Sequence, residues 1–397
     1  MKQGLLSEYF DGIAVKRLSA VEADPIKSHQ HEFAGGHLRG IFGDDDRKDI
    51  PARFIWLNDE QEGVSEAGTV SWYDSRRKQK HRSAEYRLYY ADNPVASLMK
   101  PGDSFFVATR PDGTVMVIVV PEGSTVESQL VWLFGIKTES EKDFIAKNEI
   151  DDSKLDFAAR YILDELGIDT EEPEADRLDG LLEKYGTKFP GTAEFSKLAR
   201  ESLKEVSALD DADKVLMAWL EREELLFRRM ERHIVAERLK SGFMAAGNAD
   251  VDGFIAFSLS VQNRRKSRAG YSLENHLEAL LTERKIRFQR GIETENKNKP
   301  DFLFPGQAEY RNPSFDVAKL TMLGSKSTCK DRWRQVLSEA QRIEQKHLLT
   351  LEPGISENQT GEMRAKGLQL VLPRPLHETY RASQPSWLFS VSHSSNS

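Results

Sequence analysis

The pattern of apolar residues changes character twice along the chain, and these changes constrain the fold more than any other feature. Up to about residue 135 the apolar segments are short, aromatic and β-branched, and a Pro-Asp-Gly turn at 111–113 joins two of them as a hairpin. From 194 to 240 the apolar residues recur at three- and four-residue spacing, which indicates one buried face of a helix. After 270, helical and strand patterns alternate. The chain is therefore predicted to be a multidomain α+β protein.

The domain boundaries are predicted from changes in composition. A β-rich N-terminal domain is expected over 1–150, and an acidic stretch with Gly and Pro is expected to form a linker over 151–185, although 152–166 has a helical pattern. Residues 186–381 are expected to form an α/β domain with a mixed central sheet, and the Ser-rich segment 382–397 is expected to be a disordered tail. A chain of 397 residues is long enough for each domain to bury its own core.

Composition excludes several classes of protein. Cys329 is the only cysteine, which excludes a disulfide framework and a Cys-rich zinc site. No apolar run approaches the ~18 residues of a membrane helix, and the N-terminus lacks the apolar core of a signal peptide, so a cytoplasmic protein without a membrane partner is expected. The net charge of −8 disfavours nucleic-acid binding in general, but the distribution of basic residues matters more than their sum.

Two residues after 300 form a pattern typical of metal-dependent phosphodiester hydrolysis. Asp301 follows a proline at the start of one apolar strand pattern, and Lys326 ends the next. Such hydrolysis needs carboxylates that hold a divalent metal and a lysine that orients the nucleophile. This is the arrangement of PD-(D/E)xK nucleases. Asp301 as a plain strand-end cap is the alternative.

The second carboxylate of that pattern is missing, because position 324 is a glycine. Glu339 is a candidate replacement if a helix over 331–346 turns its side chain back toward the strand end. Glu274 is a third candidate acid on the helical segment 272–285, although a glutamate in a first helical turn often only complements the helix dipole.

Four segments together resemble EcoRII-type restriction endonucleases, over roughly 186–380. They lie at 260–270, 272–278, 298–305 and 326–335. The resemblance implies an active site made of Glu274, Asp301, Lys326 and Glu339, with Mg²⁺ held by the three acids. It also implies hydrolysis of both strands of a short G·C-flanked palindrome, CC(A/T)GG or a relative, to leave 5′-phosphates.

Two groups of residues near this site are candidates for DNA contact. Arg and Lys can bond guanine bidentately and Asp can accept from cytosine, so Lys330, Asp331 and Arg332 suit recognition of G·C pairs. A solvated helix start is the alternative for them. The basic residues expected to contact phosphates, or else to form a solvated surface, are Arg264, Arg265, Lys266, Arg268 and Arg334.

The N-terminal region is similar to the EcoRII effector domain, a DNA-binding pseudobarrel, at 16–20 and 28–30. In a type IIE-like enzyme this domain binds a second copy of the site and restrains the nuclease until it does so. A basic stretch at 75–82, flanked by aromatic residues, is either a second part of this DNA surface or a plain charged hairpin. The DNA-binding candidates are Lys16, Arg17, His29, Arg76, Arg77, Lys78, Lys80 and Arg82.

The resemblance also implies partners. Double-stranded DNA is the substrate, a palindromic target favours a homodimer, and a DNA methyltransferase of the same system is expected to act without forming a stable complex. Two rival hypotheses remain open. One is a sequence-specific DNA-binding regulator that has lost activity, and the other is a structure-directed repair nuclease on the same fold.

Overall fold

The computed structural model describes residues 4–24, 31–79, 81–136, 143–170, 180, 183–245 and 247–394. The chain divides into two compact units. The N-terminal unit comprises Met1–Glu171 and Pro353–Thr360, and the C-terminal unit comprises Glu172–Glu352 and Gly361–Ser397. Each contains a mixed sheet, which confirms the expected α+β class.

The N-terminal unit is built on an eight-stranded sheet in the order β2-β5-β4-β3-β7-β6-β1-β8. Its β3 and β7 are parallel, and its other neighbouring strands are antiparallel. The predicted hairpin at 111–113 joins β6 to β7, where Gly113 takes the left-handed conformation that this turn requires. The strands are β1 (Gly12–Arg17), β2 (Glu32–Ala34), β3 (Arg47–Trp56), β4 (Val64–Asp74), β5 (Tyr86–Tyr90), β6 (Ser104–Thr109), β7 (Val115–Val120) and β8 (Ile145–Lys147), and the helices are α1 (Ala20–Ala23), α2 (Arg39–Phe42), α3 (Thr125–Phe134) and α4 (Phe157–Glu165).

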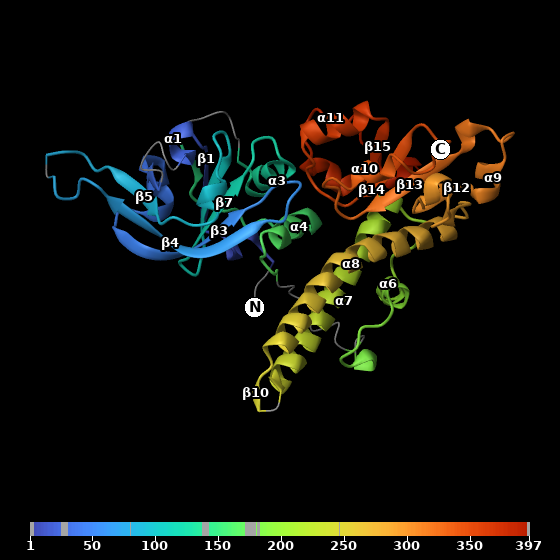
Figure 1. Cartoon of the computed structure of the whole chain (residues 1–397), viewed down its shortest axis with the longest axis horizontal. Helices are drawn as coiled ribbons and strands as arrows, with labels where there is room; N and C mark the ends of the chain where they lie inside the picture. The colour runs from blue at the N-terminus through green and yellow to red at the C-terminus, as the bar shows by residue number, and fades with distance from the viewer. Residues whose placement is uncertain are drawn as a thin grey trace. The chain divides into compact units, whose positions relative to one another are not determined.

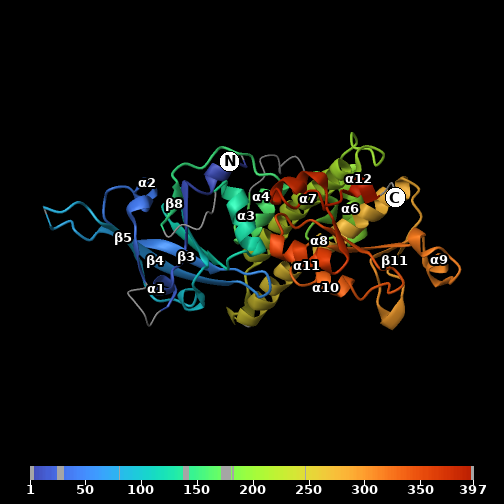
Figure 2. The same ribbon diagram turned by 90° about the horizontal axis from the view of Figure 1, so that it is seen from above.

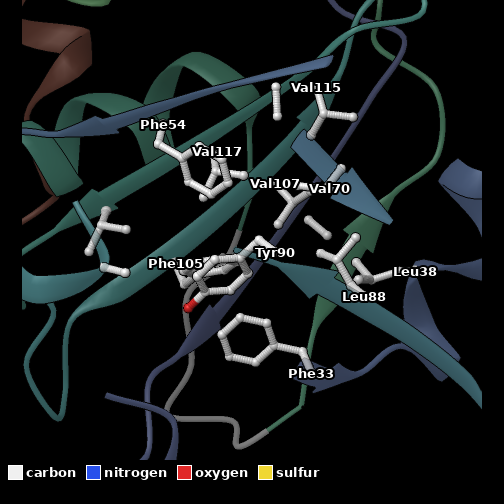
Figure 3. Close-up of a cluster of buried hydrophobic side chains, with 14 of the residues drawn as sticks. Phe33, Leu38, Phe54, Val70, Leu88, Tyr90, Phe105, Val107, Val115 and Val117 are labelled. Carbon is white, nitrogen blue, oxygen red and sulfur yellow. The ribbon is translucent and has the colours of Figure 1, made fainter. Parts of the chain in front are cut away.

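The two edges of this sheet approach each other without pairing among the described residues. Phe33 lies on the edge strand β2, and Phe144 directly precedes the opposite edge strand β8, yet their ring centroids are 6.0 Å apart. The enclosed core contains Tyr90, Phe105 and Val107, whose side chains gather in the interior of the curled sheet (Figure 3). This is the pseudobarrel that the N-terminal sequence predicts.

A second apolar cluster covers the outer face of the sheet, where α3 and α4 pack. Ile162 and Leu163 of α4 are buried in it, because the apolar residues of this short helix fall on one face. The linker expected over 151–185 therefore starts too early, since residues up to 168 belong to the core of the unit. Residues 171–179, 181 and 182 of that range lie outside the described residues.

The C-terminal unit contains a five-stranded sheet in the order β11-β12-β13-β14-β15. The first two pairs are antiparallel and the last two parallel, which confirms the mixed sheet predicted for this region. The strands are β9 (Met244–Ala245), β10 (Asn248–Ala249), β11 (Gln289–Arg290), β12 (Phe302–Phe304), β13 (Thr321–Lys326), β14 (Lys346–Thr350) and β15 (Leu368–Val371), and the helices are α6 (Thr192–Glu201), α7 (Ala212–Ser241), α8 (Val251–Glu283), α9 (Gln307–Arg311), α10 (Trp333–Val336) and α12 (Val391–Ser394). A further helix, α11 (Glu357–Ala365), lies in this unit from residue 361 onward.

Helices α7 and α8 form a long antiparallel hairpin and lie side by side (Figures 1 and 2). The short β9–β10 ribbon joins them at the tip. Their contact surface is rich in charged side chains as well as apolar ones. In the part of the chain that the structure describes, no helix is long and apolar enough to span a membrane.

Two predictions about the C-terminal unit are wrong. The helix expected over 331–346 is reduced to α10, and turns follow it, because Ala340 takes a left-handed conformation (φ 44°) that stops a helix. The tail expected over 382–397 is placed in the fold as far as residue 394. Phe389 forms a parallel bridge to Val371, and the carboxylate of Asp213 accepts hydrogen bonds from the Val391 amide (2.8 Å) and the Ser392 hydroxyl (2.7 Å).

Candidate active site

An aspartate and a lysine from neighbouring strands meet at one end of the C-terminal sheet. Asp301 immediately precedes β12, and Lys326 is the last residue of β13, with which β12 is antiparallel. The Lys326 Nζ donates to Asp301 Oδ2 over 2.9 Å, and the backbone N–H of Ser325 donates to the same oxygen over 2.6 Å. The carboxylate is therefore fixed by two donors from the adjacent strand.

Gly324 occupies the position where the nuclease pattern has its second carboxylate, and the structure explains its absence. A Cβ atom built at 324 would lie 2.9 Å from Cγ2 and 3.1 Å from Cγ1 of Val336, which α10 packs over the strand. Real Cβ atoms essentially never approach a heavy atom below 3.0 Å. A side chain here would have to displace Val336, which favours a carboxylate supplied by another element.

We expect Gly324→Ala to lower the free energy of unfolding by about 1–3 kcal/mol, because the added methyl group overpacks the space beside Val336. Gly361→Ala on α11 is the matched control. No atom lies within 4 Å of a Cβ built there, so alanine should stabilise the protein by about 0.5–1 kcal/mol. Chemical denaturation of the three proteins tests this. A Gly324→Ala protein as stable as wild type would show that Val336 moves aside at little cost.

Glu339 supplies a carboxylate close to Asp301 from the turn after α10. Burial and then the charge of Asp301 raise the pKa of Glu339 to about 7, against opposing effects of Lys326 and Lys346. Its Oε2 atom is buried and has no hydrogen-bond partner within the described structure. A buried carboxylate oxygen without a donor is unusual and costly, which marks this atom as one that a cation would satisfy.

The turn that carries Glu339 is held from two sides. The Asn298 side chain donates to the carbonyl of Ser338 over 2.8 Å, and the buried Lys346 Nζ donates to the carbonyl of Ala340 over 2.7 Å. Lys346 was not among the residues predicted from the sequence. The available signal was a charged residue that opens an otherwise apolar strand, where lysines are rarely fully buried.

Glu274 also lies near this pair, but its carboxylate already has a partner. Burial and the charge of Asp301 raise the pKa of Glu274, while the Arg290 guanidinium 2.5 Å away lowers it. No group of three or more Asp, Glu, His or Cys side chains among the described residues is arranged to hold a metal. Arg290 on β11, which sequence reasoning missed, thus binds the Glu274 carboxylate in this structure.

The segment expected to read bases follows the end of β13. Asp331 and Arg332 are exposed, and Lys330 is half-buried. Arg334 forms an ion pair of 2.8 Å with Glu362 of α11 and lies 4.6 Å from the centroid of the Trp333 ring. The side chains of Asp331 and Arg332 are thus accessible to a ligand beside the acid–lysine pair.

The arginines of α8 are not arranged as expected for phosphate contacts. Arg265 pairs with the buried Glu231 over 2.5 Å, and Arg268, mostly buried, pairs with Glu224. Arg264 lies 4.6 Å from the ring centroid of Phe189. Glu231 and Glu224 lie on α7, so these two ion pairs join α8 to α7 and engage the guanidinium groups of Arg265 and Arg268 in this structure. The side chain of Lys266 lies outside the described residues.

Some of the DNA-binding candidates of the N-terminal unit are ion-paired or buried, and others are exposed. Lys16 is wrong as a phosphate ligand, because it is 7% exposed, pairs with Glu22 and lies 5.3 Å from the Phe144 ring centroid. Arg17 pairs with Glu127 over 2.5 Å. Arg76 pairs with Glu85 and Arg77 with Asp46, whereas Lys78 and Arg82 are exposed. His29 and Lys80 lie outside the described residues.

Comparison with known proteins agrees with this picture of the C-terminal unit. Residues 227–394 match the family model described as EcoRII C terminal, and they include the acid–lysine cluster, which consists of Glu274, Asp301, Lys326 and Glu339. The C-terminal region of the chain is EcoRII-like. The type II restriction enzyme EcoRII of Escherichia coli is 43% identical over 201 residues, which are 50% of this chain and 48% of EcoRII. The chain thus spans about half the length of this curated relative.

Two solved structures are also similar to part of this chain. The metal-depleted Ecl18kI complex with uncleaved, modified DNA is 16% identical with a TM-score of 0.42, covering 55% of this chain and 80% of that one. The PspGI–substrate DNA complex is 16% identical with a TM-score of 0.43, covering 52% and 91%. The sequence match alone confirms the resemblance that the four segments predict.

Proposed function

We propose that the protein is a type II site-specific deoxyribonuclease that hydrolyses both strands of a short G·C-flanked palindrome, CC(A/T)GG or a relative, to leave 5′-phosphates. The observation that carries this proposal is the Asp301–Lys326 pair beside the unpartnered buried oxygen of Glu339. All three residues lie in the region similar to EcoRII, which is named a type II restriction enzyme.

Asp301 and Glu339 fit a divalent cation, and we infer that Mg²⁺ occupies this place. Carboxylate oxygens are the ligands that Mg²⁺ prefers, and Glu339 Oε2 lacks any other partner in the described structure. A divalent ion supplies charge that polarises a phosphate and lowers the pKa of a bound water. Glu274, which pairs with Arg290, lies near Asp301, whose charge raises the pKa of Glu274.

The protein groups have separate tasks in this proposal. Lys326, whose Nζ lies 2.9 Å from Asp301 Oδ2, orients the attacking water and offsets negative charge in the transition state. The two donors on Asp301 keep its carboxylate in one orientation before DNA binds, so little reorganisation is needed during the reaction. Lys330, Asp331 and Arg332 read the G·C pairs from the adjacent loop.

Assembly and regulation follow from the target. A two-fold symmetric site favours a homodimer that places one acid–lysine cluster at each strand. The N-terminal pseudobarrel would bind a second copy of the site as an allosteric effector, through exposed basic residues such as Lys78 and Arg82. A methyltransferase of the same system would protect host DNA without a stable complex.

The proposal is tested with plasmid DNA and Mg²⁺, followed by mapping of the fragment ends. Discrete fragments with 5′-phosphates at one short sequence support restriction. A mobility shift without cleavage would instead support a DNA-binding regulator, and cleavage confined to branched or damaged DNA would support a repair nuclease.

Cleavage of a plasmid with a single site is expected to accelerate, on the order of tenfold, when a short duplex that carries the mapped site is added. The duplex occupies the N-terminal unit and supplies the second copy. A duplex with a scrambled site is the control. Equal rates with both duplexes would remove the effector role and leave the nuclease assignment unaffected.

A further inference from the structure

The segment proposed to read bases has an unusual backbone. Lys330 has φ 34°, in the left-handed region that residues other than glycine seldom adopt. It belongs to no strand or α-helix, since β13 ends at Lys326 and α10 begins at Trp333. Asp331 and Arg332 project to solvent. Neighbouring groups must therefore hold this backbone, because exposed side chains cannot.

One buried carboxylate provides that support. Glu352 is 5% exposed, and its Oε2 accepts hydrogen bonds from the backbone N–H of Cys329 and, over 3.4 Å, from that of Lys330. It lies just beyond the end of β14, and β14 is parallel to β13, so the two strands end at the same edge of the sheet. This register brings Glu352 under the segment that follows Lys326.

Glu352 is itself held in place by its own backbone. The buried Tyr380 hydroxyl donates to the Glu352 carbonyl over 2.8 Å, and the Glu352 N–H donates to the hydroxyl of Thr350 over 3.2 Å. Burial of a carboxylate is costly unless donors compensate it, and backbone N–H groups that bind a charged acceptor form strong hydrogen bonds. The Glu352 carboxylate therefore binds the backbone at Cys329 and Lys330.

We propose that Glu352 is a positioning residue for sequence discrimination: it fixes the backbone at Cys329 and Lys330 so that the side chains of 330–332 meet the base edges in one geometry. The inference rests on the proposed nuclease function. Glu352 touches neither DNA nor the reacting phosphate in this proposal. Its loss should therefore weaken the preference for the correct base pairs more than it slows hydrolysis.

The test uses the full-length protein and the mapped site, with Glu352→Leu and Glu352→Gln. Values of kcat and KM are measured on a duplex with this site and on duplexes with one altered G·C pair. For Glu352→Leu we expect KM on the correct site to rise and the ratio of kcat/KM between correct and altered duplexes to fall, each on the order of tenfold. The rate at saturating DNA should fall much less. Glu352→Gln keeps an acceptor oxygen and should recover most of the discrimination.

Asp213→Leu is the matched control. Asp213 is fully buried in the same unit and also accepts backbone N–H groups, those of Arg374 and Val391, but it holds the C-terminal segment. This variant should lose stability without losing discrimination. Folded Glu352→Leu that discriminates like wild type overturns the proposal, as would a similar loss in Asp213→Leu.

A second measurement does not depend on how the variants fold. The amides of Cys329 and Lys330 in the wild-type protein should exchange with deuterium slowly, because a buried acceptor holds them. Exchange as fast as that of exposed loop amides overturns the proposal. Wild-type protein that fails to cleave any site defeats the proposed function instead, and this failure is visible before any variant is compared.

Discussion

Replacing Asp301 by asparagine is expected to lower the rate of DNA cleavage by about a thousandfold or more. Asparagine retains the size of the side chain and removes its charge, so Lys326 would lose the carboxylate 2.9 Å from its Nζ and the metal would lose a ligand. Binding of DNA should be retained or strengthened, because the change removes negative charge next to a phosphate. Single-turnover cleavage and fluorescence anisotropy with a labelled duplex measure the two effects separately.

Asp316→Asn is the control for this experiment. Asp316 is exposed in the same unit and caps a single turn through the N–H of Ala318, outside the acid–lysine cluster. Its cleavage rate should stay within about twofold of wild type. An Asp301→Asn enzyme that keeps more than a tenth of the wild-type rate would show that the reaction takes place elsewhere.

Glu339→Gln should abolish cleavage and yet stabilise the metal-free protein at pH 8 by up to about 3 kcal/mol. Folding raises the pKa of Glu339 to about 7 through burial and the charge of Asp301. At a pH above the pKa that Glu339 has in the unfolded chain, its carboxylate must either bind a proton or be buried with its charge when the wild-type protein folds. This penalty appears as pH rises past about 4.5 and is complete above about 7. Glutamine does not carry it at any pH.

Denaturation curves at pH 5 and pH 8 in the presence of a chelator test this prediction. The two proteins should be nearly equal in stability at pH 5 and should differ at pH 8. Addition of Mg²⁺ should then stabilise wild type but not Glu339→Gln, because only the carboxylate has charge to share with the ion. Equal stability of the two metal-free proteins at pH 8 would mean that the carboxyl has a compensating partner.

The fold was predictable where local pattern decides it. The Pro-Asp-Gly turn, the short β segments and, apart from the helix over 331–346, the alternation after 270 correspond to observed elements, because each depends on neighbouring residues in the chain. Asp301 and Lys326 were identifiable for the same reason: each flanks an apolar strand. Their meeting follows from the pairing of β12 with β13.

The features that could not be predicted depend on contacts between residues that are far apart in the sequence. Lys16 and Arg268 were predicted from the sequence to be free basic residues. In the structure, Glu224 of α7 binds Arg268, and the Nζ of Lys16 lies 5.3 Å from the ring centroid of Phe144. The turn at Glu339 is another case, since a side chain from 298 fixes it. No window of local sequence contains both partners of such contacts.

The close approach of Val336 to Gly324 couples the residues that these two positions can carry. In this chain an acid at the strand position would have to displace Val336, since a Cβ atom at 324 would lie 2.9 Å from Cγ2 of that residue. A smaller residue at 336 would have to come earlier, and it would carry the cost of a cavity under α10 with no catalytic benefit of its own. The effect of an acid at 324 on stability is therefore expected to depend on the residue at 336, so that the two substitutions are epistatic.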